Sequence, residues 1–210
     1  MTSSKTLLAL FLLTTSLCSA QTMVGLQGGL NWSNYDVKPT PGDVFGTGSA
    51  SSYGILFQSK VANELCVIVG LSHINKTIPW LVHQDLESGA PDIEFQYEFT
   101  ELSASLKKEF PIFNLRPYII AGGTYGFLIS GSYIDSRFAG PNYVVDWTNN
   151  YKRSDLNLNL GLGLSYNLAE SILIFTDVKY SYDLVSLNKN SANNTYIRST
   201  QCWCGILFGD

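Results

Sequence analysis

Residues 156–167 read Leu-Asn-Leu-Asn-Leu-Gly-Leu-Gly-Leu-Ser-Tyr-Asn and alternate between apolar and small or polar side chains without a break. A period of two is typical of a β-strand, in which successive side chains point to opposite faces. One face of this segment is entirely apolar, and its length suits the roughly 9 to 11 residues of a tilted membrane strand. The segment therefore predicts a strand that turns its apolar face to lipid.

The same alternation, with less purity, predicts seven further strands around residues 24–32, 53–57, 65–72, 94–106, 118–128, 172–184 and 197–208. Between 94 and 106 the apolar positions switch from odd to even numbers, which predicts a β-bulge or register change near Thr100 and Glu101. The expected fold class is all-β: an antiparallel up-and-down transmembrane β-barrel of about eight strands.

The connections between these segments alternate in length. Short ones lie around residues 61–64, 108–114 and 168–170, and longer ones at 33–50, 75–92, 130–154 and 186–195. Outer-membrane barrels have short periplasmic turns and long extracellular loops, and an even strand number places both termini in the periplasm. A soluble lipocalin-like barrel is the structural alternative, but the many Gly, Asn, Asp and Lys residues opposite the apolar positions favour a polar lumen and a lipid-facing exterior.

The N-terminal residues have the layout of a signal peptide. Lys5 precedes an apolar run from Leu7 to Leu13, and small residues at Cys18 and Ala20 predict cleavage before Gln21. Residues 1–20 are thus expected to be the signal peptide and residues 21–210 one barrel domain in a bacterial outer membrane. Lipidation at Cys18 is the alternative, which Leu17 at the preceding position disfavours.

The composition agrees with a membrane exterior. Charged residues make up 14% of the chain, compared with about 25% in soluble domains. The net charge of −4 leaves no basic stripe that would neutralise phosphates, so no nucleic-acid partner is expected. The expected partners are outer-membrane lipid and, through the loops, envelope or extracellular proteins or glycans.

Four segments together resemble the PorT-like outer-membrane β-barrel family of Bacteroidota: residues 25–31 (GLQGGLN), 116–122 (RPYIIAG), 158–164 (LNLGLGL) and 177–182 (DVKYSY). The resemblance spans nearly the whole mature chain. It implies an eight-stranded barrel with outward loops, and some members of the family take part in protein secretion. Asp183, where relatives often have Gly, and the trailing Gly209-Asp210 depart from the pattern.

The polar faces of two predicted strands suggest a network of charges inside the barrel, made of Glu94, Glu98, Asp177, Lys179 and Asp183. Side chains nearly fill the interior of an eight-stranded barrel, so these charges are expected to form a structural plug rather than a pore. An unpaired carboxylate there would be costly, so Lys179 is expected to contact at least one acid.

Aromatic residues form two further predicted groups. An interfacial girdle is expected from residues at or near strand ends, Trp32, Tyr118, Tyr166, Tyr182 and Phe208. A candidate partner-binding loop is expected from the aromatic residues of the third long connection, Tyr133, Phe138, Tyr143, Trp147 and Tyr151.

No catalytic, cofactor or metal site is expected. His73 and His83 match no strong ligand spacing, and no nucleophile elbow or nucleotide-binding loop occurs. Cleavage leaves an odd number of cysteines, Cys66, Cys202 and Cys204, which predicts no disulfide framework. The sequence therefore favours a non-enzymatic outer-membrane scaffold, adhesion or assembly component. The alternatives are a part of a secretion apparatus and a narrow channel or small-ligand-binding barrel.

Overall fold

The computed structural model describes residues 22–36, 44–81, 93–135, 144–146, 148–187 and 195–209. The expected signal peptide and its cleavage point lie outside these ranges. Among the described residues, no helix is long and apolar enough to cross a membrane. The described ranges contain ten strands and one short 3-10 helix: β1 (Thr22–Asp36), β2 (Val44–Phe45), β3 (Gly48–Ala62), β4 (Leu65–Leu81), β5 (Ile93–Glu109), β6 (Leu115–Asp135), β7 (Val144–Asp146), η1 (Thr148–Asn150), β8 (Ser154–Ala169), β9 (Ile172–Asp183) and β10 (Tyr196–Gly209).

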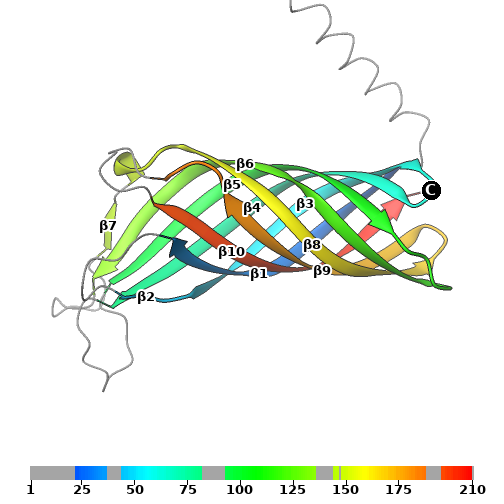
Figure 1. Ribbon diagram of the computed structural model, residues 1–210, viewed down its shortest axis with the longest axis horizontal. Helices are drawn as coiled ribbons and strands as arrows, with labels where there is room; N and C mark the ends of the chain where they lie inside the picture. Colours follow the sequence, from blue (N-terminus) through cyan, green and yellow to red (C-terminus); the bar gives the residue numbers. More distant parts are fainter. Residues whose placement is uncertain are drawn as a thin grey trace, which may run out of the picture.

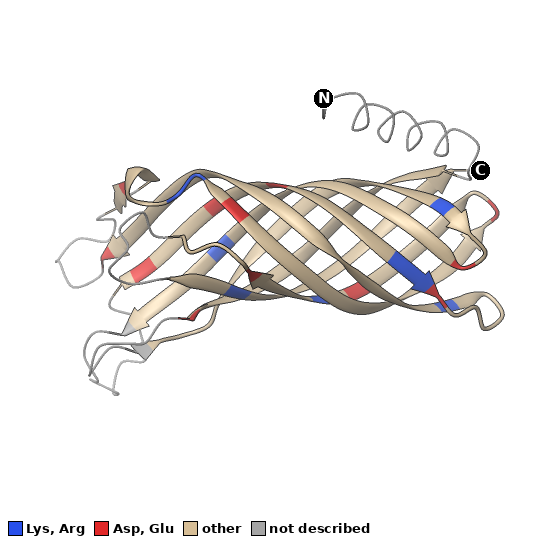
Figure 2. Ribbon diagram, turned by 45° about the horizontal axis from the view of Figure 1, so that its top comes forward, with Lys and Arg blue, Asp and Glu red and all other residues tan. Residues whose placement is uncertain are grey.

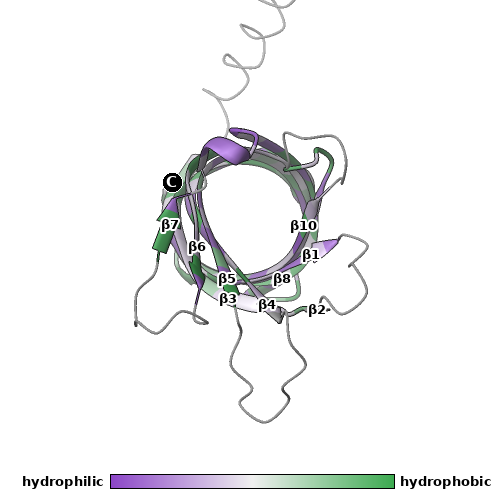
Figure 3. Cartoon of the chain, turned by 90° about the vertical axis from the view of Figure 1, so that its left-hand side faces the viewer, coloured by the Kyte–Doolittle hydropathy of each residue, from purple (hydrophilic) through white to green (hydrophobic). Residues whose placement is uncertain are grey.

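Eight of these strands close into one barrel (Figures 1 and 3). Each pairs antiparallel with its neighbours in the order β1, β3, β4, β5, β6, β8, β9 and β10, and β10 returns to pair with β1. The two short strands β2 and β7 extend the edges of β4 and β6. The structure confirms the expected antiparallel up-and-down transmembrane barrel.

The two ends of the barrel differ. One carries the brief connections between β3 and β4, β5 and β6, and β8 and β9, together with the start of β1 and the end of β10; we call it the short-turn end (Figure 1). The other carries the longer connections and is called the long-loop end. The short and the longer connections thus lie at opposite ends of the barrel, as their alternation along the sequence predicts.

The outside of the barrel wall is apolar because β8 and its neighbours keep the alternation of the sequence. Leu160 and Leu162 each expose 67% of their surface, whereas Asn157 and Ser165 on the opposite face are buried. A continuous exposed apolar band would be unfavourable in water and suits the hydrocarbon of a bilayer. Figure 2 shows that charged segments are sparse along the same wall.

The strands are longer than the sequence pattern predicts. β5 has 17 residues and β6 has 21, although roughly 9 to 11 suffice to cross a bilayer. Beyond the apolar band, β5 reverses its polarity: Phe95 and Tyr97 are buried inside, and Glu98 faces outward. That part of the strand has the polarity of a soluble barrel, which indicates water outside it.

The register change predicted near Thr100 and Glu101 is confirmed in part. The inward and outward positions of β5 alternate without interruption from Ile93 to Glu109. The apolar residues change face because the solvent outside the strand changes, while the phase of the backbone stays the same. A register shift occurs between Glu98 and Phe99 of β5. Glu98 pairs with Ser130 and Phe99 with Leu128, so the extra residue, Ile129, lies on β6. This bulge reverses which residues of β6 face inward.

Candidate functional site: the barrel lumen and the long-loop end

The lumen contains a buried ion cluster around Lys76, which extends inward from β4. Its ammonium group lies 3.4 Å from Asp155 Oδ2 and 3.6 Å from Glu101 Oε1, and all three side chains are almost fully buried. Asn157 donates a hydrogen bond of 3.0 Å to the same oxygen of Asp155. The ammonium group also lies 4.7 Å from the centre of the Phe99 ring. The cluster joins β4, β5 and β8 across the lumen.

A second charged layer lies nearer the short-turn end. Lys107 contacts Glu109 at 2.8 Å and donates a hydrogen bond of 3.1 Å to Gln58. Its ammonium group is 4.2 Å from the centre of the Tyr118 ring, and Arg116 contacts Glu109 at 3.4 Å. Every charge in this layer thus has a partner of opposite sign.

Between the two layers, Tyr118 and Lys179 converge on one carboxylate. The hydroxyl of Tyr118 donates a hydrogen bond of 2.9 Å to Asp177 Oδ2, and Lys179 lies 3.4 Å from Asp177 Oδ1. Gly163 makes room for this arrangement, because a Cβ atom there would lie 2.5 Å from Tyr118 Cζ. The glycines at positions 161 and 163 therefore leave room for side chains in the lumen.

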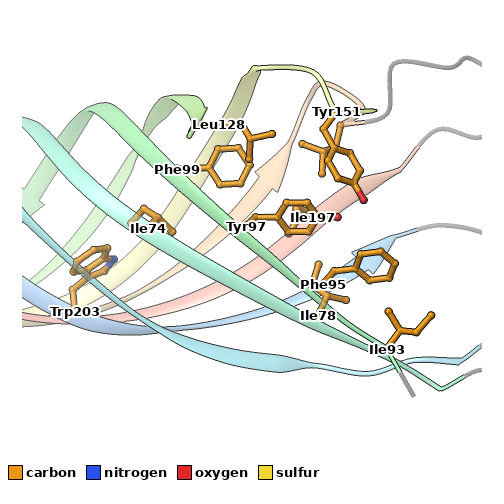
Figure 4. Packing of buried hydrophobic residues seen from close by; sticks show 11 residues of the cluster. Ile74, Ile78, Ile93, Phe95, Tyr97, Phe99, Leu128, Tyr151, Ile197 and Trp203 are labelled. Atoms are coloured by element: carbon orange, nitrogen blue, oxygen red, sulfur yellow. The ribbon is translucent and has the colours of Figure 1, made fainter. Parts of the chain in front are cut away.

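Aromatic side chains fill the lumen toward the long-loop end (Figure 4). Tyr97 and Phe99 are among the most deeply buried side chains, and they pack with Ile74, Ile78 and Ile197. Tyr35 and Tyr97 are joined by a hydrogen bond between their hydroxyl groups. We call the following aromatic side chains of this region the aromatic plug: Tyr35, Trp80, Phe95, Tyr97, Phe99 and Tyr151.

Two titratable groups near the long-loop end have shifted pKa values. Burial raises the pKa of the Tyr151 phenol above its usual value. The hydroxyl group and the backbone N–H of Thr148 both donate to Asp146 and lower the pKa of that carboxyl group. These two hydrogen bonds connect the end of β7 with the start of η1.

Small voids remain in the middle of the lumen. One of about 30 Å³ lies beside Gln27, Ser72 and Thr124, and another of about 20 Å³ lies beside Lys107, Tyr118 and Asp177. A single water requires roughly 10 to 15 Å³ measured in this way. Each void is large enough for one or two waters, and the two form no solute-sized passage.

The structure brings together part of the predicted lumen network. Asp177, Lys179 and Asp183 lie inside the barrel, and Asp183 accepts a hydrogen bond of 2.7 Å from the backbone N–H of Ile197. Glu94 and Glu98 do not belong to this network. They face outward on the part of β5 that projects beyond the apolar band, because the interior positions there are aromatic.

Sequence reasoning missed the centre of the network. Lys76 lies in a stretch expected to be a loop, yet it continues β4 in phase with Ile74 and Ile78. That phase is the available signal: a lone lysine at an inward position, flanked two residues away on either side by isoleucine. Lys107, Glu101 and Asp155 could be found in the same way, by extending each strand's alternation past its apolar outer face.

The aromatic predictions divide similarly. Trp32, Tyr166, Tyr182 and Phe208 face outward and are exposed, as a girdle requires. Tyr118 is wrong as a girdle residue, since it is 3% exposed and points into the lumen. Exposed outward aromatics of the barrel strands that the predicted girdle omitted are Tyr53, Phe57, Tyr125, Phe127 and Tyr180.

The predicted partner loop is also corrected in part. Tyr151 is buried in the aromatic plug, and the Tyr133 ring packs 6.2 Å from the Phe95 ring, so both help to close the barrel. Phe138, Tyr143 and Trp147 lie outside the described residues. The aromatic residues of this connection therefore do not all form one exposed contact surface.

The remaining reactive side chains are dispersed. Cys66 is buried in the lumen, and Cys202 and Cys204 lie on the outer face; all three are free thiols. His73 faces outward beside Tyr53, and His83 lies outside the described residues. Within the part of the chain that the structure covers, no group of three or more His, Cys, Asp or Glu side chains could hold a metal ion.

A surface groove lies on the outside of the wall near the long-loop end. It has a volume of about 370 Å³, and it crosses β9, β10 and β1. Its lining includes Trp32, Tyr180, Thr200, Asn34, Asp36 and Arg198. The groove is much larger than the voids in the middle of the lumen.

No family model matches the chain, and no curated protein matches it. Solved structures do resemble it. Neisserial surface protein A has a TM-score of 0.56 at 15% identity, covering 89% of this chain and 97% of its own. The outer membrane protein OprG from Pseudomonas aeruginosa has 0.54 at 15%, covering 91% and 96%. A major outer membrane protein from Thermus thermophilus has 0.52 at 15%, covering 91% and 100%.

These likenesses extend over the whole barrel and show its fold. The chain has the closed eight-stranded antiparallel architecture of outer-membrane barrels. At such low identity, the ligands and roles of the similar proteins do not carry over residue by residue.

Proposed function

We propose that this chain is a non-enzymatic barrel of a bacterial outer membrane that acts as a scaffold, adhesion or assembly component through its long-loop end. The observation that carries the proposal is the filled lumen. Paired charges around Lys76 and Lys107, followed by the aromatic plug, occupy the interior. Among the residues that the structure describes, the voids in the lumen form no solute-sized passage, which favours a role for the surfaces of the barrel.

The orientation of the barrel in the membrane is inferred from the polarity of its outer wall. The apolar band lies nearer the short-turn end, and the projecting part of β5 bears Glu94 and Glu98 outward. Outer-membrane barrels direct their short turns to the periplasm. The long-loop end, with its water-facing strand extensions, is therefore the part of the molecule presented to the exterior. Membership of the PorT-like family and an origin in Bacteroidota stay predictions from the resemblance.

The proposal is tested by cross-linking in living cells. A photo-reactive phenylalanine derivative replaces Glu98, which faces outward at the long-loop end, or Lys108, which lies exposed at the short-turn end. We expect cross-links to envelope or extracellular partners from position 98 and none from position 108.

Both positions are exposed and lie on one strand, so they form a matched pair. Cross-links from position 108 alone would indicate a periplasmic role and contradict the proposed outward surface. An absence of cross-links from both positions, together with solute conductance in planar bilayers, would favour the narrow-channel alternative.

A further inference from the structure

The groove on the outer wall has a notched shape that follows from strand register. Thr200 on β10 lies directly opposite Trp32 on β1 and Tyr180 on β9. All three side chains face outward, and the middle one is small. Neighbouring strands lie about 4.8 Å apart, so the backbones that bear the two aromatic residues lie roughly 10 Å apart across Thr200. A flat ring would fit between them with an aromatic contact on both sides.

The edge of the groove nearer the long-loop end is polar and held in place. Arg198 Nη2 donates a hydrogen bond of 2.7 Å to Asp36, and Nη1 donates one of 3.0 Å to the carbonyl of Asp183. The guanidinium group also stacks 3.5 Å from the centre of the Tyr182 ring. These contacts fix the planar donors of Arg198 before any ligand arrives, which lowers the entropy cost of binding.

The charge of this edge is balanced. Arg198 and Asp36 form an ion pair, and the carboxylate of Asp36 is 58% exposed. Asn34, which pairs with Arg198 in the ladder, adds an amide that both donates and accepts. The edge therefore offers donors and acceptors side by side without a net charge, an arrangement that suits vicinal hydroxyl groups and not an anion.

From these observations we infer that the groove binds one or two neutral sugar rings, stacked between Trp32 and Tyr180 and hydrogen-bonded by Arg198, Asp36 and Asn34. Its volume of about 370 Å³ is at the small end of ligand sites, which range over roughly 300 to 1,000 Å³. The inference rests on the proposed function, because it names a ligand class for the outward surface. The rings could come from a soluble or host glycan or from the headgroup of an outer-leaflet glycolipid.

The test uses the mature barrel in phosphatidylcholine nanodiscs, free of sugar-based detergents. One arm titrates maltose, lactose, cellobiose and N,N′-diacetylchitobiose and follows saturation-transfer NMR. The other arm places lactosylceramide or digalactosyl diacylglycerol in the nanodisc and measures its enrichment around the barrel. Binding in the first arm identifies a soluble source, and binding in the second alone identifies a glycolipid; either result supports the inference.

Three variants make the result specific. Trp32→Leu removes one aromatic wall and Thr200→Ile fills the floor, and both keep a side chain that lipid tolerates. Tyr53→Leu is the matched control, since it removes an exposed outward aromatic residue of β3 that does not line the groove. We expect binding to weaken about tenfold or more in the first two variants and to be unchanged in the control.

Several outcomes would overturn the inference. These are no binding of any probe in either arm, equal binding by Thr200→Ile and the wild type, and preferential binding of sulfated disaccharides over the neutral ones. Cross-links from position 98 of a barrel that binds no sugar would refute the inference and leave the proposed function standing. A barrel that shows neither cross-links from position 98 nor sugar binding would refute both the inference and the proposed function.

Discussion

Lys76 illustrates how one residue determines the state of the lumen. Its ammonium group is removed from water and contacts two carboxylates, so the charges depend on one another. Taking away one partner of a buried pair leaves an uncompensated charge, which costs about 3–5 kcal/mol. The same deletion in an exposed pair costs about 0–1 kcal/mol.

Replacing Lys76 by methionine is therefore expected to lower the free energy of unfolding by about 3–5 kcal/mol. The matched control is Lys108→Met, because Lys108 contacts Glu64 at 2.7 Å and both side chains are nearly half exposed. Urea unfolding in lipid vesicles measures both changes. Equal effects of the two substitutions would contradict a water-excluding ion cluster around Lys76.

Tyr118 tests the corrected placement of an aromatic residue. Tyr118→Phe removes the hydrogen bond to the Asp177 carboxylate and keeps the ring beside Lys107. Hydrogen bonds to charged groups contribute about 1.5–3 kcal/mol, and we expect that loss in the same unfolding assay. Tyr166→Phe is the control on the outer face. A larger loss of unfolding free energy at position 166 than at position 118 would contradict the placement of Tyr118 in the lumen.

Individual strands show why sequence alternation predicts one part of the barrel well and the other poorly. On β8 the outside is lipid along the whole apolar run, so alternation and fold agree from Leu156 to Tyr166. On β5 the outside changes from lipid to water, and the apolar residues change face with it. A single sequence records the apolar face but not the solvent, so Phe95 and Glu98 were assigned to the wrong sides.

The same limit explains the missed ends of β4 and β6. Outward residues such as Asn75 and Ser132 carry no apolar signal where water is outside, and the segments therefore resemble loops. The bulge at Ile129 adds a second difficulty, because an extra residue reverses the phase without any distinctive residue type. The alternation of short and long connections, the number of barrel strands and the topology were predictable because they depend on the turns and the lipid-facing segments.

Two arginine substitutions on one face of β5 test this change of solvent. Ala104→Arg lies in the middle of the apolar band and is expected to destabilise the barrel by about 2–4 kcal/mol. Gln96→Arg lies on the projecting part and is expected to change stability by less than about 0.5 kcal/mol. The folded fraction in vesicles at increasing urea concentration measures both, and a comparable loss at the two positions would mean that lipid covers the whole strand.

At the scale of the molecule, the aromatic plug and the ion layers close the lumen in series. Tyr97→Ala combined with Phe99→Ala removes the two most deeply buried rings of β5. We expect this double variant to show more frequent current steps in planar bilayers than the wild-type barrel. The control is Tyr125→Ala with Phe127→Ala, which removes two exposed outward rings of β6. Equal currents from the two double variants would show that the aromatic plug does not limit conductance.

The outer wall and the lumen together describe a molecule whose apolar surface requires lipid and whose interior is held by paired charges. We expect such a barrel to resist detergent at room temperature, because unfolding breaks the closed ladder of strands and separates the paired charges.

The most direct measurement is gel migration of the protein extracted in detergent from outer-membrane fractions, with and without boiling. A closed transmembrane barrel predicts that the unboiled protein migrates as a compact band and that boiling shifts it to a different mobility. A protein found in the soluble periplasmic fraction, with the same mobility before and after boiling, would contradict the transmembrane barrel.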